Sequence, residues 1–157
     1  MKKLLIISLL IGSVYAESDY SKNLTKHNLT IGYIDDRTGY SIFSYTNNFK
    51  QTEKNEFFFG VGTLLPIGLI GLTPTLGLQH YFWKSKISIY SAFSTQGFIH
   101  FGGYWYLPTA SLALQYNLAD WVQIKAGYFG GIHLGESSYE AGSDIGVFPF
   151  AGLIFRL

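Results

Sequence analysis

Two long stretches without a charged residue constrain the fold of this chain more than any other feature. Residues 57–83 and 87–119 contain no Asp, Glu, Lys or Arg. A membrane-crossing helix needs about 20 apolar residues, so the second stretch is too long for one helix and too short for two. Two tilted membrane-crossing strands of about 9 to 11 residues, joined by a turn, fit both stretches. The lengths therefore favour strand hairpins.

Within these stretches apolar and polar residues alternate with a period of two, which is the pattern of strands with one apolar face. In residues 72–83, for example, Leu76 and Leu78 alternate with Thr75 and Gln79. The same alternation is found in residues 87–90, 110–118, 122–128 and 147–157. The apolar face is continuous enough to predict strands that face lipid.

Alternation and turn residues together predict eight strands, an even number as single-chain membrane barrels prefer. Their expected ranges are 26–34, 39–47, 56–65, 72–83, 86–99, 105–118, 121–132 and 145–157. The predicted fold class is all-β, an eight-stranded antiparallel up-and-down transmembrane β-barrel. Pro149 cannot donate a ladder hydrogen bond, so we expect a bulge or a bend in the last strand.

The connections between the predicted strands fall into two kinds. Residues 83–86 and 119–121 are tight polar turns, which belong on the periplasmic side of such a barrel. Segments 35–39, 66–71, 102–103 and 134–144 should then face outward. Four aromatic residues near the tight turns are expected at the membrane interface, where aromatic girdles form: Phe82, Trp83, Tyr116 and Trp121.

The first sixteen residues have the organisation of a secretory signal peptide. Lys2 and Lys3 precede an apolar core at residues 4–11, and the segment ends in Val14-Tyr15-Ala16. The core is shorter than the roughly 20 residues of a membrane anchor. Cleavage after Ala16 would leave residues 17–157 as one barrel domain in the bacterial outer membrane.

Composition removes several classes of function. The net charge is +1, and no basic cluster exists that could bind nucleic acid. The chain has no cysteine, which excludes disulfides, thiolate metal sites and cysteine nucleophiles. Phosphate-binding, dinucleotide-binding and zinc motifs are also missing, so no cofactor is expected.

The signal peptide, alternating strands, short turns and apolar-alternating last strand resemble the small eight-stranded outer-membrane β-barrel superfamily, of the outer-membrane protein A transmembrane-domain and opacity-protein type. The resemblance covers the whole mature chain and implies contact with outer-membrane lipid. Members typically end in an aromatic residue, whereas this chain ends in Phe155-Arg156-Leu157. Their activities differ too much for the resemblance to assign one.

Lys125 is the charge placed in the middle of a predicted strand, and its alternation directs it into the barrel. A buried unpaired cation costs several kcal/mol, so it needs an acidic partner or water, and Glu56 is the candidate. Arg156 falls on the same inward-facing alternation. We interpret these charges as structural rather than as a transport device, because side chains generally fill an eight-stranded interior.

The predicted outer segment from His133 to Asp144 gathers histidine, hydroxyl and carboxylate side chains. Together with an aromatic tip it supplies the candidates for contact with an extracellular ligand or protein: His133, Glu136, Ser138, Glu140, Asp144, Tyr104, Trp105 and Tyr106. Lipid A deacylases carry a histidine and a serine two residues apart, and none of the four histidines here has that neighbour. No catalytic residue is therefore assigned, and the EF-hand spacing for calcium is missing.

The sequence favours an integral, porin-like outer-membrane barrel at the bacterial cell surface, with a structural or surface-interaction role and no open pore. Two alternatives stay open. One is an enzyme of the lipid A deacylase type that modifies outer-membrane lipid. The other is a secreted soluble barrel that binds a lipid inside, with the face of Leu76, Leu78, Leu112 and Leu114 turned inward.

Overall fold

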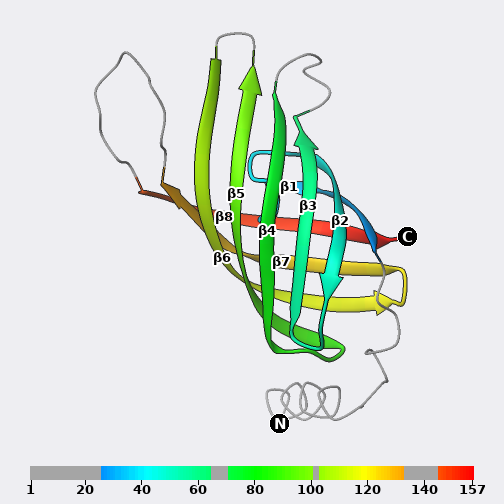
Figure 1. The fold of residues 1–157 in the computed structure, drawn as a ribbon. Coiled ribbons are helices and arrows are strands. Elements are labelled where there is room, and N and C mark those ends of the chain that lie inside the picture. Colours follow the sequence, from blue (N-terminus) through cyan, green and yellow to red (C-terminus); the bar gives the residue numbers. More distant parts are fainter. Residues whose placement is uncertain (1–25, 65–70, 101–102, 133–144) are drawn as a thin grey trace.

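The computed structural model describes residues 26–64, 71–100, 103–132 and 145–157, which form one closed barrel (Figure 1). Its strands are β1 (His27–Tyr33), β2 (Phe43–Gln51), β3 (Asn55–Thr63), β4 (Leu72–Trp83), β5 (Ile87–His100), β6 (Gly103–Ala119), β7 (Val122–Ile132) and β8 (Ile145–Arg156). Each strand pairs antiparallel with the next, and β8 pairs with β1. The predicted all-β, eight-stranded antiparallel up-and-down barrel is confirmed. Among the described residues, no helix has the length and apolar character to cross a membrane.

Burial alternates along the strands because successive side chains of a strand point to opposite faces of the sheet. In β6, Ser111 and Gln115 are buried inside the barrel, whereas Leu112 and Leu114 are 58% and 55% exposed on its outer surface. The inward face is therefore mainly polar and the outward face mainly apolar.

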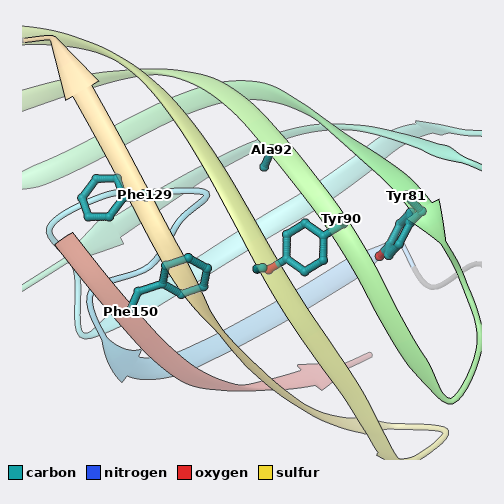
Figure 2. Close-up of a cluster of buried hydrophobic side chains, with 6 residues drawn as sticks. Tyr81, Tyr90, Ala92, Phe129 and Phe150 are labelled. Atoms are coloured by element: carbon teal, nitrogen blue, oxygen red, sulfur yellow. The ribbon is translucent and has the colours of Figure 1, made fainter. Parts of the chain in front are cut away.

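The interior also contains a cluster of buried aromatic and small side chains. Figure 2 shows Tyr81, Tyr90, Phe129 and Phe150 directed into the space that the strands enclose. The rings of Tyr81 and Tyr90 lie 5.8 Å apart. Close packing extends to the backbone, because a Cβ atom at Gly77 would lie 2.5 Å from Cζ of Phe58. Side chains thus fill much of the lumen.

The second strand lies four residues later than expected. Its predicted range was 39–47, whereas β2 runs over Phe43–Gln51. The expectation that segment 35–39 faces outward is also wrong, since Asp35, Asp36, Arg37 and Thr38 are all buried. The connection curls back into the barrel, as Figure 1 shows between β1 and β2. Inside the barrel, the charged side chains of this connection pair with groups of opposite charge. This pairing replaces the contact with water that a polar loop usually has.

The bulge or bend expected at Pro149 is not present in the pairing of β8 with β7. Tyr128 lies opposite Pro149, and the register continues without a shift on both sides. The pairing of β8 with β1 ends where Tyr33 lies opposite Ala151. Because β1 does not reach Pro149, the missing donor leaves no gap in that ladder.

The tight connections lie together at one end of the barrel. Residues 52–54 join β2 to β3, residues 84–86 join β4 to β5, and residues 120–121 join β6 to β7. The start of β1 and the end of β8 lie at this same end (Figure 1). We call it the turn end.

Two glycines of β7 provide a matched test of interior packing. A Cβ atom at Gly127 would lie 2.3 Å from the backbone oxygen of Leu112, whereas at Gly130 the nearest atom is 3.4 Å away. We expect Gly127→Ala to lower the free energy of unfolding by about 1 to 3 kcal/mol, because the backbone must shift. Gly130→Ala should change it by less than about 1 kcal/mol. Urea unfolding followed by tryptophan fluorescence measures both, and similar losses would contradict the packing described.

Candidate functional site: the charged interior

The connection between β1 and β2, residues 34–42, carries most of the charges of the interior; we call it the inward segment. Its loop is closed by hydrogen bonds between the backbones of Asp35 and Gly39, at 2.9 and 2.5 Å. Gly39 has a φ of 73°, a conformation that glycine adopts without strain, and a Cβ there would overlap the side chain of Gln96. Ile34 has a φ of 58°, which is strained for a β-branched residue. Packing of Ile34 against the aromatic cluster holds it in place.

Lys125 of β7 pairs with two carboxylates of the inward segment. Its Nζ lies 2.5 Å from Oδ1 of Asp35 and 2.6 Å from Oδ1 of Asp36. All three side chains are almost completely buried. The expected inward position of Lys125 is thus observed, but the expected partner is wrong, because Glu56 pairs elsewhere. Two carboxylates of the inward segment lie closer to Nζ of Lys125 than the carboxylate of any described strand residue does.

Arg37 forms the second half of the network. Its Nη2 lies 2.8 Å from Oε2 of Glu56. Its Nε and Nη2 donate to Oε1 of Gln79 at 2.8 and 2.5 Å. Its Nη1 donates to Oδ1 of Asn48 at 3.2 Å. The guanidinium carbon lies 4.8 Å from the ring centre of Phe58. The N–H groups of Arg37 are therefore hydrogen-bonded, while the flat face of its guanidinium stacks on the ring.

The remaining oxygens of the two aspartates accept hydrogen bonds from hydroxyl groups. Oδ2 of Asp35 accepts from Ser44 and, at 3.1 Å, from Oγ1 of Thr38. Oδ2 of Asp36 accepts from Oγ of Ser111 at 3.2 Å. Buried charges are tolerated when they are paired and their other lone pairs are occupied. Both carboxylates meet that condition.

The pKa of Asp35, which lies in the connection and not in a strand, is held well below its usual range. Burial by itself raises this pKa, but the ammonium group of Lys125 and hydrogen bonds from Lys125, Ser44 and the Arg37 backbone together outweigh burial. These contacts favour the ionised form of Asp35, as its pairing with Lys125 requires.

The network contains three carboxylates and three cations. Asp35, Asp36 and Glu56 face Arg37 and Lys125 inside the barrel, and Lys84 reaches Glu56 from the turn end at 3.3 Å. Such an arrangement can fix the inward segment across the lumen. Within the described residues, no group of three or more histidine, cysteine or acidic side chains has an arrangement suited to a metal ion.

Arg156 is half-buried at the turn end, with its Nε buried and its charge close enough to act on Glu56 of the network. The remaining predicted site residues lie away from this network. The four interface candidates Phe82, Trp83, Tyr116 and Trp121 are exposed on the outer surface near the turn end. Tyr106 is exposed on β6, and the side chains of Tyr104 and Trp105 are not among those described. His133, Glu136, Ser138, Glu140 and Asp144 lie outside the described residues, as do residues 1–16.

Sequence reasoning missed the main charged residues of the site, Asp35, Asp36 and Arg37. The predicted sidedness places them in an outward-facing connection, because the tight turns are assigned to the periplasmic side. The sequence did contain a signal for them. These three adjacent charged residues follow the predicted first strand, and Lys125 inside the barrel needed a partner of opposite charge.

No protein family, curated protein or solved structure matches this chain. The function is therefore inferred from the geometry of the barrel.

The assignment of partners to Lys125 can be tested by substitution. Lys125→Met should lower the free energy of unfolding by about 3 to 5 kcal/mol, because it leaves two buried carboxylates without a cation. Adding Asp35→Asn and Asp36→Asn to that variant should restore a large part of the loss. Equilibrium unfolding in urea measures each variant.

The matched control combines Lys125→Met with Glu56→Gln. Glu56 pairs with Arg37 and Lys84, so this change should add a further loss rather than restore stability. Recovery by Glu56→Gln, and none by the aspartate substitutions, would show that Glu56 is the partner of Lys125.

Proposed function

We propose that this chain is an integral outer-membrane β-barrel protein with a closed interior and a structural or surface-interaction role. The observation that carries the proposal is that the barrel has mainly polar side chains inside and apolar side chains outside. Among the described residues, 28 large hydrophobic side chains are exposed and only eight hydrophobic residues are buried. Soluble domains rarely expose contiguous apolar patches larger than a few hundred Å². A lipid environment would accommodate such a surface.

The closed sheet supports the same proposal. A strand edge left open in lipid has backbone groups without partners, and closure of β8 on β1 removes that edge. Exposed aromatic side chains, including Trp83 and Trp121, lie near the turn end of the apolar surface. Aromatic rings at that position are typical of a membrane interface. The signal-peptide pattern of residues 1–16 supports export across the inner membrane.

The interior argues against a secreted barrel that carries a lipid in its lumen. Such a barrel would need an apolar cavity, with the leucine face of β4 and β6 turned inward. Instead, Leu76, Leu112 and Leu114 are exposed outside, and Gln79 and Lys125 are buried within.

The inward segment supports a barrel without an open pore. It contacts strands from β2 to β8: Arg37 reaches β2, β3 and β4, Asp36 reaches β6 and β7, and the ring of Tyr40 lies 5.6 Å from that of Phe148 in β8. Gly39 packs against Gln96 of β5. An eight-stranded barrel has an interior only about wide enough for side chains, and here a second layer of chain occupies it.

Fractionation and electrophoresis test the proposal directly. The mature chain should begin at Glu17, sediment with outer membranes, and remain there after washing with alkaline carbonate. Without boiling, the detergent-extracted barrel should migrate faster than the boiled chain, because closed barrels resist unfolding by detergent. Recovery in a soluble fraction, or an uncleaved form in the inner membrane, would overturn the proposal.

A neighbouring pair of substitutions on β6 tests which face meets lipid. Leu114→Arg should destabilise the inserted barrel by about 2 to 4 kcal/mol if Leu114 lies near the midplane. Gln115 points into the lumen, so Gln115→Leu should change the stability of the inserted barrel much less. Denaturant titration in lipid vesicles measures both, and equal effects would contradict the assignment of the two faces.

Planar-bilayer recording tests the closed interior. The purified wild-type barrel should insert without stable single-channel steps, because the inward segment fills the lumen and its charges are paired. Insertion is verified separately by the electrophoretic shift. Reproducible steps whose size changes in Lys125→Met would replace the closed-interior proposal with a transport role.

A further inference from the structure

The charged residues of the described chain are segregated into two groups. Five lie inside the barrel: Asp35, Asp36, Arg37, Glu56 and Lys125. The other eight all lie at the turn end: Lys26, Lys50, Glu53, Lys54, Lys84, Lys86, Asp120 and Arg156. Six of these eight are basic and two are acidic, so the described part of the turn end carries an excess of positive charge. The described residues at the opposite end carry no charged side chain.

The basic side chains are spread around the circumference of the barrel. Lys26 precedes β1, Lys50 lies near the end of β2, Lys54 lies in the turn between β2 and β3, and Lys86 lies between β4 and β5. Arg156 ends β8, which pairs with β1. A single compact ligand or a nucleic acid would require a contiguous patch. A ring of separated cations fits many small anions arranged around the protein.

The described carboxylates neutralise few of these cations. Lys84 pairs with Glu56. Among the described residues, Lys50, Lys54 and Lys86 have no carboxylate within ion-pair distance. Lys50 and Lys54 are exposed and Lys86 is half-buried. Their ammonium groups are therefore available to a charge outside the chain.

Aromatic rings place two of these ammonium groups at the margin of the apolar surface. Nζ of Lys86 lies 5.7 Å from the ring centre of Tyr116, and Nζ of Lys50 lies 5.6 Å from that of Phe57. Trp83 and Trp121 are exposed in the same zone. Aromatic side chains at a membrane interface lie at the level of the lipid headgroups. Cations beside them are at the depth of the phosphate groups.

We propose that the turn end is a binding surface for anionic phospholipid, whose headgroup phosphates are held by Lys50, Lys54 and Lys86 beside the aromatic margin. The inference rests on the proposed membrane insertion. Basic residues beside a bilayer surface gain from attraction to anionic lipids, and the gain is screened by salt. The surface would favour the membrane leaflet that contacts the tight turns.

The test uses the full mature barrel in phosphatidylcholine vesicles with spin-labelled phosphatidylglycerol or spin-labelled phosphatidylcholine as the probe. Electron paramagnetic resonance separates lipid held at the protein surface from bulk lipid. We expect phosphatidylglycerol to associate about fivefold more strongly than phosphatidylcholine, and the preference to disappear in molar salt.

Two sets of variants identify the residues. Lys50→Gln, Lys54→Gln and Lys86→Gln combined should abolish the preference. The matched control, Glu53→Gln with Asp120→Asn, removes two charges at the same end and should strengthen it. If the triple variant does not fold, the salt dependence of the wild-type preference for phosphatidylglycerol still tests the proposal.

Electrophoretic mobility before and after boiling reports insertion in the same samples. A barrel that inserts but holds both labels equally overturns the phospholipid surface and leaves the membrane proposal intact. A chain that does not insert into either vesicle overturns both.

Discussion

The pairing of Lys125 with Asp35 and Asp36 is the interaction on which the rest of the interior depends. A lysine in the middle of a small barrel cannot remain unpaired, because the cost of burying an isolated charge is several kcal/mol. No strand residue supplies its counter-charge in the described structure; the connection between β1 and β2 does. To do so, the chain leaves the sheet after Tyr33 and re-enters it at Phe43. The short first strand and the late second strand accompany this excursion of the chain into the lumen.

The same segment determines what fills the lumen. Arg37 crosses to Glu56 and Gln79, and Tyr40 lies against Phe129 and Phe148. A buried ion pair by itself adds little net stability compared with well-packed apolar residues. Its contribution is geometric, since a buried charge that loses its partners is costly and so holds the groups around it in place. We infer that the network selects one position of the inward segment.

The side chains are segregated by polarity and charge in two directions. Radially, polar and paired groups lie inside while leucine, phenylalanine and tyrosine cover the outside. Along the barrel axis, the described charges that remain exposed lie at the turn end. The first division supports the proposed lipid environment, and the second underlies the proposed phospholipid surface at the turn end. Both divisions arise from the placement of residues along and around the strands.

The sequence alone determined the class of fold, most strand boundaries and which residues share a face in the strands from residue 72 onward. These properties are local: side chains alternate along an extended chain whatever their neighbours are, so Leu112, Leu114 and Gln115 could be assigned by counting. The sequence also placed Lys125 inside. The partner of Lys125 was decided only by tertiary structure, because Asp35 and Asp36 lie about 90 positions earlier in the chain. Which carboxylate reaches it depends on the curvature of the closed sheet and on the space left inside, and neither is a property of any local segment.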